Sequence, residues 1–168
     1  IATSLNNIGQ VYKSLGKYKD ALNYYEQSLK ILRSIYPNDN HSDIATSLNN
    51  IGQVYKSLGK YDEALKYYEQ SLKIKRSIYP KDNHSDIASS LNNIGGVYYS
   101  LGKYDEALNY HEQSLKIRRS IYQNENHSEI ASSLNNIGGV YISLGKYDEA
   151  LNYLEQSLKI LRSIYPND

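Results

Sequence analysis

The chain has 168 residues, of which 40% are hydrophobic, and its 19 basic side chains nearly balance 18 acidic ones. Without a basic excess, we expect neither nucleic acid nor an anionic membrane as a partner. The chain has no cysteine, which excludes disulfides and thiolate metal sites. No stretch approaches the roughly 18 consecutive apolar residues of a transmembrane helix.

One segment of sequence returns every 43 residues, as IATSLNNIG at Ile1 and Ile44 and as IASSLNNIG at Ile87 and Ile130. Such a period indicates stacked supersecondary units, none of which can bury its apolar face alone. We therefore expect a single solenoid over residues 1–168, with repeats at 1–43, 44–86, 87–129 and 130–168, the last one truncated. We also expect the chain to be an excerpt of a longer array. The lack of cysteine is compatible with the cytoplasmic location that we expect.

Each unit opens with a helix-forming pattern. Apolar residues fall on one helical stripe at Ile1, Leu5, Ile8, Tyr12 and Leu15, and Gly16-Lys17 then interrupts the pattern. A second amphipathic segment follows at 18–36, and it ends at Pro37, Pro80 and Pro166, or at Gln123 in the third unit. The unit is thus a helix A, a tight turn, a longer helix B and a polar corner, so four units predict eight helices and no strands.

The corner supplies the start of the next helix A. An asparagine precedes an acidic residue by three positions, which predicts an N-cap and an acid at N3 for the pairs Asn40 and Asp43, Asn83 and Asp86, and Asn126 and Glu129. The histidines that follow, His41, His84 and His127, are interpreted as helix-start residues. Zinc needs nitrogens about 2.0–2.1 Å away, whereas packed helices lie roughly 8–10 Å apart, so we expect no metal site. The Asn-His-Ser triplets also match the N-glycosylation pattern, but capping explains the same asparagines.

Nine positions that recur in the units resemble the tetratricopeptide repeat, whose standard unit has 34 residues. In the first unit they are Leu5, Ile8, Gly9, Tyr12, Gly16, Tyr18, Ala21, Tyr25 and Ser28. The resemblance implies an all-α fold, a right-handed α-solenoid superhelix of helix-turn-helix repeats. The lengthened unit, with its SLNNIG and DNHSDIA segments, is similar to the repeats of kinesin light chains. His111 replaces Tyr25 in this pattern, and we expect a packed core histidine there.

Only three columns of helix A vary among the four units, and all lie in the arc opposite the apolar stripe. In tetratricopeptide arrays helix A lines the concave face, so the resemblance places this arc inside a groove. The predicted peptide-binding residues are Asn6, Gln10, Lys13, Asn49, Gln53, Lys56, Asn92, Tyr99, Asn135 and Ile142. The alternative is that solvent-facing positions drift without constraint.

The four asparagines of this arc would form a ladder of amides suited to an extended peptide backbone. The first two units add lysine and glutamine, whereas the last two add Tyr99 and Ile142 beside glycines. We therefore expect a ligand with an acidic end over the first two repeats and an apolar or aromatic end over the last two.

No catalytic set or phosphate-binding loop stands out, so we predict a non-enzymatic scaffold that binds a peptide or partner protein without a cofactor. The alternative is a structural array that stacks end to end or exchanges helices into a dimer, because helix A of the first repeat and helix B of the last keep apolar residues. One column remains unexplained by the pattern: Leu32, Lys75, Arg118 and Leu161 fall near the apolar arc of helix B, yet two of them are charged.

Overall fold

The computed structural model describes residues 1–123 and 125–166. Over these residues the chain forms eight α-helices and no strand, as the repeat pattern predicts. The helices are α1 (Ala2–Ser14), α2 (Tyr18–Ile35), α3 (Ser42–Ser57), α4 (Tyr61–Ile78), α5 (Ser85–Ser100), α6 (Tyr104–Ile121), α7 (Ser128–Ser143) and α8 (Tyr147–Ile164). The chain divides into two compact units, Ile1–Pro80 and Lys81–Asp168, each of which holds two repeats.

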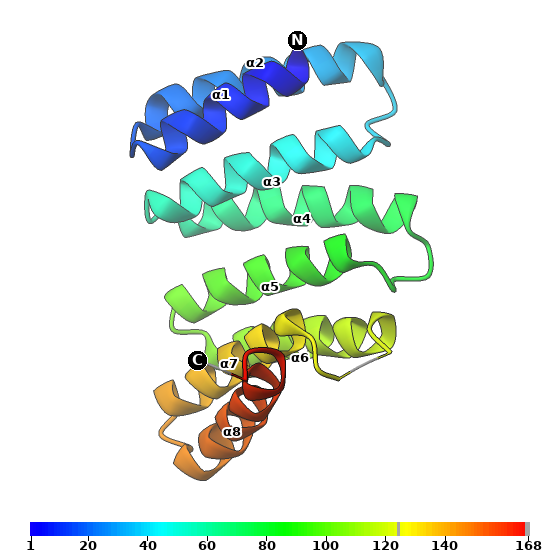
Figure 1. Ribbon diagram of the computed structural model, residues 1–168. Helices are drawn as coiled ribbons and strands as arrows, with labels where there is room; N and C mark the ends of the chain where they lie inside the picture. Colours follow the sequence, from blue (N-terminus) through cyan, green and yellow to red (C-terminus); the bar gives the residue numbers. More distant parts are fainter. Residues whose placement is uncertain (124, 167–168) are drawn as a thin grey trace. The chain divides into compact units, whose positions relative to one another are not determined.

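Within each unit, helix A and helix B of one repeat pack side by side, and helix B also packs against the next helix A (Figure 1). In the first unit, α2 is covered by α1 on one side and by α3 on the other. In the second unit, α6 lies between α5 and α7 in the same way. The helix in the middle of each such set is therefore buried on two sides, which is the packing that a solenoid repeat requires.

The tight turn after helix A depends on a glycine in the left-handed region. Gly16 has φ +71°, and its equivalents have values of 71° or 72°. The amide of Gly16 donates to the carbonyl of Lys13, and the amide of Lys17 donates to that of Tyr12 at 2.9 Å. This pair of bonds is a Schellman motif, which satisfies the last carbonyls of the helix. A side chain would be strained here, which is why Gly16 recurs in every repeat.

The N-cap of helix A is the corner histidine, so the predicted asparagine caps Asn40, Asn83 and Asn126 are wrong by one residue. The imidazole Nδ1 of His41 accepts a hydrogen bond from the amide of Asp43 at 3.2 Å, and His84 and His127 do the same. The interpretation of the histidines as helix-start residues is confirmed. The acidic residue consequently lies at N2 and not at N3, where it still complements the helix dipole. Asn40 instead accepts a hydrogen bond from Ser77.

Helix B ends in the same way with or without proline. Helices α2, α4 and α8 stop two residues before Pro37, Pro80 and Pro166, with a tyrosine as C-cap. Helix α6 stops at the equivalent Ile121, although Gln123 replaces the proline. Each C-cap tyrosine amide still donates to the carbonyl four residues before it. The proline positions predict the end correctly, but proline is not required for it.

Close approach of helices A and B fixes the core of each repeat. A Cβ added to Gly9 would lie 2.8 Å from the ring of Tyr25, so a larger residue does not fit there. Ala21 and Tyr25 are fully buried. The hydroxyl of Ser28, also buried, donates to the carbonyl of Ala2 at 2.8 Å and links the two helices. His111 is buried against Gly95, which confirms the expectation of a packed histidine.

The unexplained column on helix B lies at the contact with the next helix A. In the first unit, Leu32 is buried in one cluster with Ile44 and Leu48 of α3. In the second unit, Arg118 is buried at the matching place, and its Nη1 donates to the carbonyl of Glu129 at 2.8 Å and to Ser133 Oγ at 2.7 Å. Leu32 and Arg118 therefore face the next repeat of their own unit, where both a leucine and a hydrogen-bonded arginine are accommodated.

Candidate functional site

The residues predicted to bind a peptide form one surface of α1 and α3 in the first unit. We call the positions of Asn6, Gln10 and Lys13 and their equivalents the helix-A face of each unit, on α1 and α3 in the first unit and on α5 and α7 in the second. Lys13 Nζ donates a hydrogen bond to Gln53 Oε1 across the two helices. Asn6, Lys13, Asn49, Gln53 and Lys56 are all half-buried, and Gln10 is exposed. Helices α1 and α3 therefore bring their predicted residues together on a surface that a ligand can reach.

Part of the asparagine ladder is used within the protein. Asn6 Nδ2 donates to Ser47 Oγ at 2.9 Å, and the same hydroxyl is 3.2 Å from Asn6 Oδ1. Ser47 is buried and has the same position in α3 as Ser4 in α1. Because an amide has two donor hydrogens and two acceptor lone pairs, Asn6 keeps one of each for another partner. The asparagine thus joins neighbouring helices A while still offering hydrogen bonds outward.

Two lysines give the first unit a positive surface. Partial burial lowers the pKa of Lys13 and of Lys56, because a partly desolvated ammonium group is less stable than a hydrated one. Among the described residues no carboxylate forms an ion pair with either lysine. A carboxylate from a ligand would supply the missing charge and would compensate part of the desolvation cost.

In the second unit the same face is aromatic and apolar. Tyr99 and Ile142 are exposed, and Tyr99 Oη lies 2.9 Å from Ser143 Oγ of α7. A Cβ added to Gly139 would have no other atom within 4 Å, so the surface at this position is open. Helices α5 and α7 therefore bring Tyr99 together with Ser143 and keep room for an apolar side chain.

The asparagines of the second unit differ from those of the first. Asn92 Oδ1 accepts a hydrogen bond from Asn136 Nδ2 at 2.7 Å and lies 3.0 Å from His111 Nδ1. Ser133 of α7 is the equivalent of Ser47, but its hydroxyl accepts a hydrogen bond from Arg118. Asn135 is exposed on α7. Asn6 and Asn92 therefore share a position in the repeat but have different hydrogen-bond partners.

Sequence reasoning missed the serines that support this face. Ser47 and Ser143 hold Asn6 and Tyr99 in place. Both serine columns are present in every repeat and flank the variable arc. The unvarying serines could therefore have been recognised in the sequence as hydrogen-bond partners of this arc. Which residue each serine bonds could not, because that depends on how neighbouring helices A approach each other.

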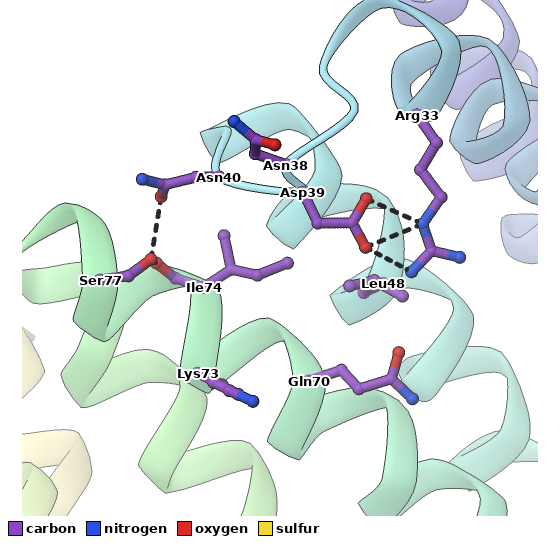
Figure 2. A pocket seen from close by; sticks show the side chains of 9 residues that line it. All are labelled: Arg33, Asn38, Asp39, Asn40, Leu48, Gln70, Lys73, Ile74 and Ser77. Carbon is purple, nitrogen blue, oxygen red and sulfur yellow. Dashed lines mark hydrogen bonds and ion pairs between the residues drawn. The ribbon is translucent and has the colours of Figure 1, made fainter.

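A pocket of about 330 Å³ lies on the corner side of the first unit (Figure 2). The Arg33 guanidinium pairs with the Asp39 carboxylate on one side, with Nη2 3.0 Å from Oδ2, and Asn40 bonds Ser77 on the other. Leu48 and Ile74 supply apolar surface, and Asn38, Gln70 and Lys73 complete the lining. The sequence did not predict this cavity, although the arginine six residues before an acid recurs as Arg119 and Glu125.

The described part of the chain contains no group of three or more His, Asp or Glu side chains that could hold a metal ion. Over the same residues, none of the helices is both long and apolar enough to cross a bilayer.

Comparisons with known proteins agree with this architecture. The tetratricopeptide repeat family model matches residues 1–77 and 82–163. The crystal structure of BtubC (BKLC) from P. vanneervenii is similar with a TM-score of 0.88 and 25% identity, over 99% of this chain and 65% of that one. The chain thus spans slightly less than two thirds of the length of BtubC. None of the curated protein sequences matches the chain.

A Podosopora anserina protein, described as a kinesin light chain with nearly identical TPR-like repeats, is also similar in fold. Its TM-score is 0.81 at 22% identity, over 96% of this chain and 75% of that one. A single-substitution variant of the same protein gives the same TM-score and identity. With helix pairs at every repeat and the family pattern along nearly all its length, the chain belongs to the tetratricopeptide repeat family.

Proposed function

We propose that the chain is a non-enzymatic scaffold that binds an extended segment of a partner protein on its helix-A face. Repeats of this family commonly serve protein interaction, and the observation that carries the proposal is the pairing of neighbouring helices A through Lys13 and Gln53 and through Asn6 and Ser47. These contacts hold polar side chains at regular places along a reachable surface. An extended peptide offers its backbone groups at similarly regular intervals.

The two units favour different ligand chemistry. Lys13 and Lys56 favour acidic side chains over the first unit, whereas Tyr99 and Ile142 favour apolar or aromatic ones over the second. The proposed ligand is therefore an extended segment with an acidic part and an apolar part. Its acidic part would make salt-dependent contacts, because partly exposed charges are screened by ions.

The test begins with a ligand selected from a library of random linear peptides and measures its affinity by titration at low salt. Lys13→Glu with Lys56→Glu should weaken binding far more than Tyr99→Ala does. The matched control is Lys30→Glu with Lys66→Glu, which makes the same charge change at exposed positions of helix B. Equal losses of affinity for the helix-A pair and the helix-B pair would contradict the proposal. Equal losses for Lys13→Glu with Lys56→Glu and for Tyr99→Ala would contradict the claim that the ligand has an acidic part over the first unit and an apolar part over the second.

A second candidate function is self-association through the apolar faces of α1 and α8. Ile8 and Val11 of α1 are 40% and 58% exposed, whereas the equivalent Ile51 and Val54 of α3 are fully buried. Leu158 of α8 is 46% exposed, whereas the equivalent Leu29 of α2 is buried. Apolar surface of this kind favours association. Light scattering over a wide concentration range tests it, since a mass that stays at 19.2 kDa would contradict it.

A further inference from the structure

We infer that His111 of α6 is a positioning residue for the helix-A face of the second unit, because it fixes the side-chain oxygen of Asn92. Asn92 then offers only its N–H groups to a ligand. The group that it binds is a hydrogen-bond acceptor, such as a backbone carbonyl of an extended segment. The inference rests on the proposed function and names one orienting residue and the chemistry of the ligand group at this place.

The oxygen of the Asn92 amide is fully engaged within the second unit. Asn92 Oδ1 accepts a hydrogen bond from Asn136 Nδ2 at 2.7 Å and lies 3.0 Å from His111 Nδ1. Because Oδ1 can only accept, His111 Nδ1 carries the proton and donates it to this bond. Both lone pairs of Oδ1 are therefore used, whereas Asn92 Nδ2 has no hydrogen-bond partner among the described residues. Asn92 is half-buried, so its two N–H donors are available to a ligand.

The histidine reaches Asn92 because α5 has a glycine at this contact. His111 is only 4% exposed, and a Cβ added to Gly95 would lie 3.0 Å from its Nδ1. Asn92 lies three residues before Gly95, so the two positions are neighbours on one side of the helix. A ring that is packed in the core has little freedom to move. It therefore orients the amide, which lies nearer the surface.

The equivalent side chain of the first repeat acts in the same direction. Tyr25 is buried, and its hydroxyl donates to Gln10 Oε1 on the helix-A face at 3.3 Å. A ring of helix B thus again engages the oxygen of an amide. In the fourth repeat this position is Leu154, which has no donor, and Asn135 is exposed. The chain itself therefore contains a repeat that lacks the interaction, and His111→Leu copies it.

The first test needs no ligand. NMR of the isotope-labelled full chain, at a pH where the ring is neutral, should show the proton of His111 on Nδ1. A ring protonated at Nε2 alone would overturn the inference, because it could not donate to Asn92.

The second test measures the affinity of the peptide selected from the random library on the parent chain. His111→Leu, which fits beside a glycine as Leu154 does, should weaken binding about three- to tenfold. His111→Asn keeps a donor at the place of Nδ1 and should lose less affinity, although it fills less space. If the histidine only fills the core, the order is reversed. Urea denaturation of both variants measures stability separately from affinity.

The third test removes the donor. Asn92→Asp keeps an oxygen for His111 but replaces the NH₂ group with a second acceptor, and it should weaken binding of the same peptide by at least about tenfold. The matched control is Asn109→Asp, which makes the same change at an exposed position of α6 where Oδ1 also accepts a hydrogen bond. It should leave the affinity unchanged.

The outcomes separate this inference from the proposed function. If Lys13→Glu with Lys56→Glu weakens binding but His111→Leu and Asn92→Asp do not, the inference is overturned while the proposed function stands. If library selection yields no peptide that binds the helix-A face, both are overturned.

Discussion

At the scale of single residues, helices A and B of one repeat approach closely at a glycine of helix A, where a side chain of helix B occupies the space that a Cβ would need. A Cβ on Gly52 would lie 2.9 Å from Tyr68 Cδ1 and 3.3 Å from the carbonyl oxygen of Ala64. Tyr68 is buried and its ring is rigid, so it cannot move aside at low cost. By contrast, a Cβ added to Gly139 on the helix-A face would meet no other atom within 4 Å.

This difference predicts opposite effects for the same substitution. Gly52→Ala should destabilise the chain by about 1–3 kcal/mol, because it forces the two helices apart. Gly139→Ala should stabilise it by up to about 1 kcal/mol, because alanine favours helix over glycine. Urea denaturation followed by circular dichroism measures both. Equal shifts of the two midpoints would show that close packing at Gly52 is unimportant.

Buried tyrosines make the fold sensitive to high pH. Burial raises the pKa of Tyr25 and of Tyr68 above the ordinary value of 10.0. The unfolded chain therefore releases these protons at a lower pH than the folded chain does. The stabilisation is complete below pH 10 and is lost as the pH rises through the folded values.

We therefore predict that stability falls as the pH rises above about 10, and that the buried tyrosines add their phenolate absorbance as the chain unfolds. Tyr68→Leu, which copies Leu154 of the fourth repeat, should reduce this dependence on pH. Exposed Tyr147→Leu serves as the control and should leave it unchanged. A chain that stays folded while all its tyrosines ionise would contradict the prediction.

At the scale of the helices, the two repeats of each unit are joined by helix B of the first and helix A of the second. Leu32 makes this joint in the first unit with apolar contacts, and Arg118 makes it in the second with hydrogen bonds to Glu129 and Ser133. Burial lowers the pKa of Arg118, while the Glu129 carboxylate opposes this effect. The arginine joint therefore carries a desolvation cost that the leucine joint does not.

Arg118→Leu should change stability by less than about 1 kcal/mol, because a leucine of suitable size can replace a buried charged group. Arg118→Ala should cost roughly 2–4 kcal/mol, because it removes the hydrogen bonds and leaves a cavity. Urea denaturation of both variants measures the difference. If leucine is as harmful as alanine, the hydrogen bonds and not the filled volume hold this joint.

The order and the ends of the helices could be predicted from the sequence, because glycine, the corner and the apolar stripe recur four times. The capping residue was predicted one position too early, because Asn40 and His41 are adjacent and both can accept a hydrogen bond. The role of Arg118 could not be predicted, since its partners lie 11 and 15 residues away on the next helix. For the helix-A face, the sequence predicted Asn6 and Tyr99 as candidate positions but not Ser47 and Ser143, with which they form hydrogen bonds.

At the scale of the whole molecule, repeats that share one backbone pattern carry different surface chemistry. The chain is almost neutral, yet Lys13 and Lys56 lie in the first unit while Tyr99 and Ile142 take their places in the second. The joint column varies separately, from leucine to lysine to arginine and back to leucine. The first set of differences lies on the helix-A face, and the second includes Leu32 and Arg118 at the contact between helix B and the next helix A.

The central claim, that a ligand lies along the helix-A face, is tested most directly by photo-cross-linking with a peptide selected on the unmodified chain. A photoreactive amino acid replaces Gln53 on α3 in one variant and Gln70, which lines the corner cavity, in another. We predict a cross-link from position 53 and none from position 70. A cross-link from position 70 alone would place the ligand on the corner side and contradict the account.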